Sequence, residues 1–357
     1  MNPAPHIGTL ASGPLGTIAD VDGVAVGHCT IDQHALQTGV TVIRPHRDDP
    51  FVHKVPAAVS VINGFGKSIG LVQVEELGTL ETPIALTNTF GVGAVAQAQI
   101  RAAIRANPQI GREWSTVNPL VFECNDGYLN DIQALAVTEQ HFNDAFDAAN
   151  ANVASGSVGA GRGMSCFDLK GGIGNASRVV EVAGRRYTVG ALVLANFGRL
   201  PMLTIDGTPL GRMLTDRAAE AATSEAAALS AKPEQGSIIM IVATDAPLDA
   251  CQLKRLSLRA AAGLARTGSV YGHGSGDIAL AFSTAYTVPH DADSITLPPL
   301  VADARLDPLF RACADSVEQA IIDALWSATS VTGRDGHRRV SLHDSVPDLA
   351  QLLKLTD

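Results

Sequence analysis

The stretch that decides the fold is Gly236-Ser237-Ile238-Ile239-Met240-Ile241-Val242-Ala243. The apolar, largely β-branched run after Gly236 predicts a strand that is buried on both faces. Gly236 leaves its own carbonyl sterically open and permits a strained backbone, so the Ser237 hydroxyl is well placed to attack the peptide bond before it. A glycine turn before a strand explains the dipeptide equally well when it is taken alone.

The segments around this strand mix strands and helices without strict alternation. Arg217 to Gln235, just before it, is alanine-rich and loosely patterned, and we interpret it as a surface excursion within one domain. A layered α/β sandwich fits this order better than a doubly wound parallel sheet. The expected strands are Gly23 to Val26, Gly39 to Ile43, Ala57 to Ile62, Pro83 to Thr87, Pro119 to Cys124, a hairpin of Arg178 to Glu181 with Tyr187 to Ala195 about Gly184, Ser237 to Thr244, and Asp277 to Tyr286; the expected helices are Val92 to Ala106, Glu139 to Ala151, Gln252 to Thr267, and Leu306 to Ala328.

Composition narrows the class of protein. The chain has 357 residues, of which 46% are hydrophobic and 17% charged, which is typical of a globular protein with a large core. Its formal net charge of -10 argues against a nucleic-acid partner, which would need a basic face. An apolar chain with modest charge also leaves surface to bury, so we expect a homo-oligomer.

The five cysteines are scattered and form no Cys-x-x-Cys pair, so we expect small core residues rather than disulfides or a zinc site. The first residues show no signal-peptide pattern, and no apolar run is long enough to span a membrane. We therefore expect a cytoplasmic protein with no membrane partner.

Two polar sites follow apolar strands. Glu123 to Asp131 is a dense polar block, in which the Glu123 carboxylate could hold a substrate ammonium and the Tyr128 hydroxyl could donate to an oxyanion. Asn196 ends the strand from Tyr187, and its amide is a neutral donor of the kind found in oxyanion holes. An Asx-turn and a strand-ending asparagine are the simpler structural alternatives.

A glycine-rich block, Gly272 to Asp277, precedes another strand. Ser275 and Asp277 could relay a proton near a nucleophile, and His273 makes a Ser-His-Asp triad worth considering. A glycine-rich loop without chemistry is the alternative. The glycines of 159–163 and 171–174 match no phosphate-binding motif and predict tight turns close to other backbone.

The ten histidines show no metal-ligand spacing, so we expect no metal and no cofactor. Most of them are interpreted as surface or capping residues: His28, His46, His53, His290, His337 and His343.

Taken together and in this order, several blocks resemble the family of β-peptidyl aminopeptidases and L-aminopeptidase/D-amidase-esterases, the DmpA and BapA type. The resemblance covers nearly the whole chain. The matching stretches are Ile18 to His28, Glu123 to Ile132, Gly156 to Gly174, Gly190 to Gly198, Gly236 to Leu248, Gln252 to Gly268, and Gly274 to Thr284.

The resemblance implies an α-β-β-α sandwich, similar to N-terminal nucleophile hydrolases but with different strand connectivity. It implies a single domain, 1–357, made as a precursor that cuts itself between Gly236 and Ser237. The products would be an α chain of residues 1–236 and a β chain of residues 237–357, assembled by resemblance as a tetramer of αβ units.

The resemblance also implies roles for single residues. Ser237 would be the nucleophile, Ser275 and Asp277 would assist it, and Asn196 and Tyr128 would form the oxyanion hole. Glu123 would grip the substrate amine. Family members can carry glutamate where this chain has Asp277, and because aspartate is one methylene shorter, we expect a longer or water-mediated contact with Ser275 or the Ser237 amine.

The resulting hypothesis is a self-processing serine aminopeptidase or amidase. It would release a small L-, D- or β-amino acid from the N-terminus of a peptide, amide or ester through an acyl-enzyme on Ser237. One alternative is an aminoacyl transferase that uses the same acyl-enzyme. Another is an uncleaved, non-catalytic small-molecule binding protein of the same fold.

Overall fold

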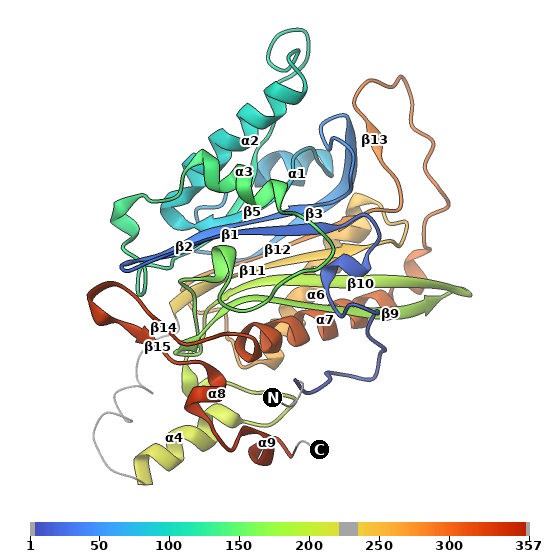
Figure 1. Ribbon diagram of the computed structural model, residues 1–357. Coiled ribbons are helices and arrows are strands. Elements are labelled where there is room, and N and C mark those ends of the chain that lie inside the picture. Colours follow the sequence, from blue (N-terminus) through green and yellow to red (C-terminus); the bar gives the residue numbers. More distant parts are fainter. Residues whose placement is uncertain (1–3, 221–234, 355–357) are drawn as a thin grey trace.

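The computed structural model describes residues 4–220 and 235–354, which fold into two facing β-sheets with helices outside them (Figure 1). The smaller sheet has four strands in the order β1-β2-β5-β6. Its first three strands are antiparallel, and β5 pairs with β6 in parallel. The strands are β1 Ala25–Gln33, β2 Leu36–Arg44, β5 Ile84–Asn88 and β6 Leu120–Cys124.

The larger sheet has seven strands in the order β13-β3-β12-β11-β10-β9, with β4 also paired to β3. Its central pair, β11 and β12, is parallel, while β10 pairs antiparallel with β11. The strands are β3 His53–Gly64, β4 Thr79–Leu80, β9 Gly172–Val182, β10 Arg185–Asn196, β11 Gln235–Thr244, β12 Gly274–Ser283 and β13 Val288–Pro289. Two short hairpins lie apart from both sheets: β7 Ser165–Cys166 with β8 Leu169–Lys170, and β14 Val331–Thr332 with β15 Arg338–Arg339.

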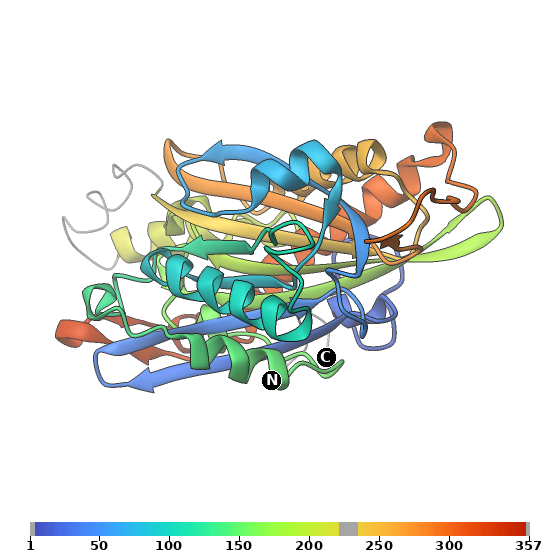
Figure 2. The same ribbon diagram turned by 90° about the horizontal axis from the view of Figure 1, so that it is seen from above.

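Helices cover the outer face of each sheet. Helices α2 and α3 pack on the smaller sheet, and α6 and α7 pack on the larger one (Figures 1 and 2). The helices are α1 Leu71–Leu77, α2 Val92–Ala106, α3 Glu139–Asp147, α4 Leu210–Glu220, α6 Ala250–Arg266, α7 Asp307–Trp326, α8 Leu342–Ser345 and α9 Leu349–Leu352. The predicted α-β-β-α sandwich is therefore confirmed.

Strand β11 shows why the sequence folds this way. Alternate side chains along a strand point to opposite faces. Ile239 and Ile241 belong to the core between the two sheets, whereas Met240 and Val242 belong to the core beneath α6 and α7. All four are at most 1% exposed, so the strand needs apolar residues at every position.

The boundaries of three helices differ from the sequence prediction. Helix α7 begins one residue later and ends two residues earlier than the expected Leu306 to Ala328. Strand β12, expected at Asp277 to Tyr286, begins and ends three residues earlier, so the glycine-rich block lies partly within it. Helix α6 begins at Ala250 because Asp249 caps it, accepting from the Gln252 N–H at 2.8 Å. Helix α3 ends at Asp147, four residues earlier than expected, because the chain turns to pair Asn150 with Val26 of β1. The predicted hairpin about Gly184 is present, with Val182 paired to Arg185. Most of the surface excursion predicted for Arg217 to Gln235 lies outside the described residues.

The prediction that the cysteines are core residues was wrong for two of the five. Cys251 is exposed at the start of α6 and Cys29 is half-buried, whereas Cys124, Cys166 and Cys313 are buried. The six histidines interpreted as surface or capping residues are all half-buried. His28 Nδ1 lies 2.9 Å from Thr41 Oγ1, and burial lowers the pKa of His28 to about 4.

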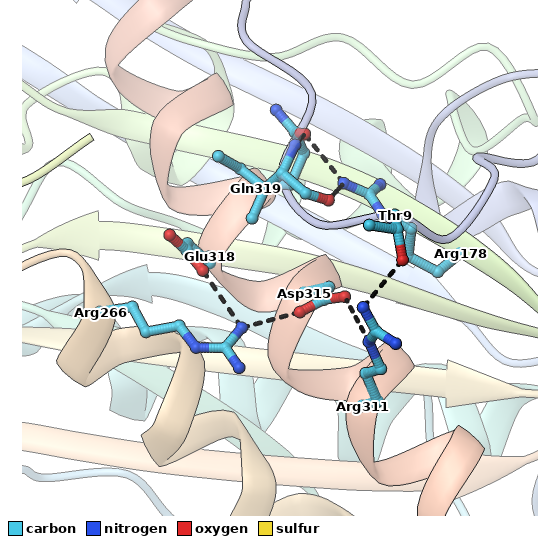
Figure 3. A network of polar contacts seen from close by, with 8 residues as sticks. Thr9, Arg178, Arg266, Arg311, Asp315, Glu318 and Gln319 are labelled. Atoms are coloured by element: carbon cyan, nitrogen blue, oxygen red, sulfur yellow. Dashed lines mark hydrogen bonds and ion pairs between the residues drawn. The ribbon is translucent and has the colours of Figure 1, made fainter. Parts of the chain in front are cut away.

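A buried polar network ties the first described residues to the larger sheet and to α7 (Figure 3). Arg178 of β9, only 1% exposed, donates to the Ile7 carbonyl at 2.7 Å and to Gln319 Oε1 at 2.9 Å. Arg266 of α6 binds Asp315 and Glu318 of α7 at 2.7 and 3.3 Å. The network thus joins residues that precede Ser237 to residues that follow it.

None of the helices among the described residues is long and apolar enough to cross a membrane.

Candidate active site

Three neighbouring strands of the larger sheet bring their polar ends to one edge. Asn196 ends β10, Ser237 lies near the start of β11, and Gly276 lies near the start of β12. The register pairs Ser237 with Asn196 on one side and with Gly276 on the other. Residues that are far apart in sequence therefore become immediate neighbours of the Ser237 backbone.

Ser237 is 6% exposed and faces a cavity of about 630 Å³. Its Oγ accepts a hydrogen bond from the Gly276 N–H at 3.1 Å. Gly236 before it has a φ of +123°, and a Cβ there would lie 2.1 Å from the Asn196 carbonyl oxygen. Only glycine fits this position without a shift of the backbone.

Ser275 and Asp277 lie next to this contact but beneath the cavity lining, and both are fully buried. The Ser275 hydroxyl donates to Asp277 Oδ1 at 2.6 Å. The expected longer contact of aspartate is therefore wrong for Ser275. Because a hydroxyl carries one proton, Ser275 does not also donate to His273 as a triad would need. His273 lines the cavity instead, beside the Phe65 ring at 6.1 Å.

The Asn196 amide is fixed by two hydrogen bonds. Its Oδ1 accepts from the Ser165 N–H at 2.8 Å, and its Nδ2 donates to the Asn125 carbonyl at 3.0 Å. An amide nitrogen carries two hydrogens, and the second makes no hydrogen bond within the described residues. Asn196 lines the cavity, so this N–H is a preorganised donor next to Ser237.

Glu123 ends β6 of the other sheet and lines the same cavity, at 2% exposure. Its Oε1 accepts from the Lys67 backbone N–H at 2.7 Å, and its Oε2 accepts from the Thr89 hydroxyl. Both donors are uncharged, so the negative charge of this carboxylate is not cancelled by them. Such a group suits a substrate ammonium.

Tyr128 is 40% exposed, and its ring is held between two side chains of the C-terminal part of the chain. The His337 ring stacks on it at 4.7 Å, and the Arg339 guanidinium lies 3.9 Å from its centroid on β15. His337 Nδ1 also lies 2.8 Å from the Tyr128 carbonyl oxygen. Tyr128 lines the same cavity as Asn196 and Ser237.

Two buried ionisable groups support the loops behind the cavity. Asp126 is fully buried, accepts from Asn130 Nδ2 at 3.0 Å, and has its pKa raised to about 6 by burial. Lys170 donates to the Gly161 and Gly171 carbonyls at 2.9 and 2.6 Å, and burial holds its pKa well below the usual value. These groups fix the backbone around Asn125 and Ser165, which in turn orient Asn196.

Sequence reasoning named no role for several lining residues. Ser165, Asp168 and Gly198 lie within stretches that carry the family resemblance, whereas Phe65, Lys67, Thr89, Arg199 and Arg339 lie outside those stretches. Asn125 lies inside the polar block already singled out, and its carbonyl rather than its side chain binds Asn196. Within residues 4–220 and 235–354, no group of three or more His, Cys, Asp or Glu side chains has the arrangement of a metal site.

A match to the model of peptidase family S58 spans residues 16–339. The chain belongs to peptidase family S58. It is 38% identical to the β-peptidyl aminopeptidase BapA of Sphingosinicella microcystinivorans over 340 residues, covering 91% of this chain and 85% of that protein. It is 37% identical to BapA of Sphingosinicella xenopeptidilytica over 358 residues, covering 96% and 88%.

Solved structures of similar proteins share the whole fold. The PH0078 protein of Pyrococcus horikoshii superposes with a TM-score of 0.90 at 44% identity, covering 98% of this chain and 96% of that one. The L-aminopeptidase D-Ala-esterase/amidase of Ochrobactrum anthropi gives 0.87 at 35% identity, covering 98% and 97%. That enzyme is described as a prototype of the serine aminopeptidases and a new variant of the Ntn hydrolase fold. This S58 chain thus has the Ntn-hydrolase-like fold and belongs among the aminopeptidases.

Proposed function

We propose that this S58 peptidase is a self-processing serine aminopeptidase and amidase with Ser237 as its nucleophile. It would cut itself between Gly236 and Ser237 into chains of residues 1–236 and 237–357. It would then release a small N-terminal L-, D- or β-amino acid from a peptide, amide or ester.

The observation that carries the proposal is the set of groups around one cavity. The Ser237 hydroxyl, the Asn196 amide and the Glu123 carboxylate all line it, and each comes from the end of a different strand. A nucleophile, an oxyanion donor and an anchor for an ammonium group are the parts that an aminopeptidase needs. The activities named for its relatives point the same way.

Self-cleavage would begin when Ser237 Oγ attacks the Gly236 carbonyl carbon. The C–N bond between the two residues breaks as an ester forms on Oγ, and the hydroxyl proton passes to the departing Ser237 nitrogen. Water then hydrolyses the ester, which leaves a carboxylate on Gly236 and a free amine on Ser237. In the register of the sheet this peptide lies beside the Ser275–Gly276 peptide, so the Ser275 and Asp277 pair is close enough to steady the new amine.

Turnover would use the same groups. Glu123 binds the substrate ammonium, Ser237 Oγ attacks the next carbonyl carbon, and the Ser237 amine takes the hydroxyl proton and passes it to the leaving nitrogen. The free Asn196 N–H, with Tyr128, stabilises the oxyanion, a contribution of about 3–4 kcal/mol for one donor. Water then attacks the acyl ester and frees the amino acid.

Release of p-nitroaniline from a panel of L-, D- and β-aminoacyl p-nitroanilides tests the proposal. We expect the purified wild-type protein to cleave at least one of them and Ser237→Ala to cleave none. A Ser237→Ala protein with wild-type turnover would exclude Ser237 as the nucleophile. Coupled product in the presence of an added amine would instead reveal aminoacyl transfer from the same acyl-enzyme.

The homo-oligomeric assembly and the cytoplasmic location stay predictions of the sequence.

A further inference from the structure

One wall of the cavity carries two guanidinium groups that the proposed chemistry does not use. Arg199 and Arg339 both face Asp168, at 2.9 Å from Arg199 Nη1 and 3.9 Å from Arg339 Nη2 to the same Oδ1. All three side chains line the cavity. Among the described residues, two cations thus face one carboxylate on this wall.

Arg339 has N–H groups that are not used in hydrogen bonds to the described residues. Its Nε donates to Ser165 Oγ and its Nη1 to the Asp168 carbonyl, each at 3.1 Å. A guanidinium has five N–H groups, so three of them make no hydrogen bond to the part of the chain that the structure describes. The side chain is 22% exposed, and its plane is fixed by the Tyr128 ring. It is therefore a rigid and unsatisfied donor group at the cavity wall.

Hydrogen bonds connect this wall to the oxyanion donor. Asn125, two residues after Glu123, binds Asn196 through its carbonyl at 3.0 Å. Ser165 binds Asn196 through its N–H at 2.8 Å and Arg339 through its hydroxyl at 3.1 Å. Asn196 is thus bound by the loop that follows Glu123 and by the residue that binds Arg339, and Glu123, Asn196 and Arg339 all line one cavity.

We propose that Arg339 binds the free carboxylate of the residue that follows the scissile bond, so that the preferred peptide substrates are dipeptides. A dipeptide carries an ammonium at one end and a carboxylate at the other, and the cavity is lined by a carboxylate, Glu123, and a guanidinium, Arg339. This inference rests on the proposed function, because it takes Ser237 and Glu123 as nucleophile and anchor.

The short connection between Asn196 and Arg339 supports a dipeptide over a longer chain. A single residue, Ser165, contacts both side chains. Each further residue of an extended substrate would move its carboxylate by about 3.3–3.6 Å. Guanidinium and carboxylate also match as a planar pair with two parallel hydrogen bonds.

Lys67 is a third cationic side chain that lines the cavity, besides Arg199 and Arg339, and it provides a competing assignment. Its Nζ lies 4.2 Å from the centroid of the Phe65 ring, and its backbone N–H binds Glu123. It is therefore attached to the ammonium end of the site, where a substrate carboxylate would meet the Glu123 charge. This placement favours Arg339.

The test compares a dipeptide with its C-terminal amide, both built on the N-terminal residue that proves best among the p-nitroanilides. We expect wild type to prefer the dipeptide roughly 10–100-fold in kcat/KM, mainly through KM, the size expected for a charged hydrogen-bonded pair. Arg339→Met should remove this preference, because it should lower kcat/KM for the dipeptide more than for the amide and the p-nitroanilide. Arg338→Met, on the exposed neighbour in β15, is the matched control and should keep the preference.

Each other result has a distinct meaning. Three results would each overturn the role of Arg339. The first is that wild type cleaves the dipeptide and the amide at equal rates. The second is that Arg339→Met loses activity equally on all three substrates, and the third is that the preference is lost in Lys67→Met instead. No cleavage of any substrate by wild type would refute the proposed function itself. If Arg339→Met does not fold, inhibition of wild-type p-nitroanilide cleavage decides, since the free leaving amino acid must inhibit more strongly than its amide.

Discussion

Replacing Gly236 with alanine should slow self-cleavage about 100-fold, because misplacing reacting groups by 1 Å can cost that much in rate. The new Cβ would lie 2.1 Å from the Asn196 carbonyl oxygen, whereas ordinary contact begins near 3.4 Å. The two backbones must therefore separate by more than an ångström. Because Asn196 is paired with Ser237, the separation moves either the oxyanion donor or the nucleophile.

The backbone conformation adds a second cost. Gly236 has a φ of +123°, where a residue with a Cβ is strained by about 1–3 kcal/mol. Two other glycines separate the two effects. Gly207→Ala has a positive φ of +73° but open space around the Cβ, and Gly93→Ala in α2 has open space and an ordinary φ.

The assay follows the disappearance of the full-length chain after expression, by denaturing mass spectrometry, together with urea unfolding of each variant. We expect Gly207→Ala and Gly93→Ala to be processed at the wild-type rate, with Gly207→Ala less stable than Gly93→Ala. Gly236→Ala processed as fast as wild type would refute the reasoning, since the close approach to Asn196 would then have no bearing on the reaction.

Three further predictions concern an anchor, a titration and the polar network. Glu123→Gln should raise KM for an aminoacyl p-nitroanilide roughly 10–100-fold, as expected for a lost charged contact. Cleavage of the des-amino analogue should stay unchanged. Equal effects on the two substrates would argue against an ammonium anchor. The folded pKa of Asp126, about 6, lies above its unfolded value of 3.8, so its contribution to stability is present at low pH and is lost as pH rises through 6. Urea unfolding at pH 4 and pH 8 should therefore show Asp126→Asn gaining about 2 kcal/mol relative to wild type between the two, and a constant difference would contradict the shift. Arg178→Met should lower the free energy of unfolding by about 3–5 kcal/mol, because the Ile7 carbonyl and Gln319 lose charged donors worth about 1.5–3 kcal/mol each. A change under 1 kcal/mol in chemical denaturation would contradict this account of the network.

The sequence predicts the layered architecture well because local pattern determines it. Strand β11 is apolar on both faces, and this property is visible in Ile238 to Val242 without any knowledge of its neighbours. The boundaries of α3 and α6 depend on one tertiary pairing and one capping side chain, Asn150 and Asp249, which a periodicity does not reveal.

The residues of the candidate site also fall into those that the local sequence pattern reveals and those that only a tertiary contact brings to the cavity. Ser237, Asn196 and Glu123 stand at the ends of strands, where polar residues after or before apolar runs attract notice. Arg339 reaches the cavity only because the β14–β15 hairpin folds against the Tyr128 loop, with Arg334 Nε donating to the Gly127 carbonyl at 2.7 Å. Such long-range docking leaves no local signal in the sequence.

The central claim is that Ser237 becomes an N-terminal nucleophile, and an intact mass of the purified protein under denaturing conditions tests it most directly. We predict two species that sum to the full chain plus one water, the smaller of them beginning at Ser237, and a single full-length species for Ser237→Ala. A single, uncut wild-type chain that nevertheless cleaves aminoacyl substrates would contradict the account.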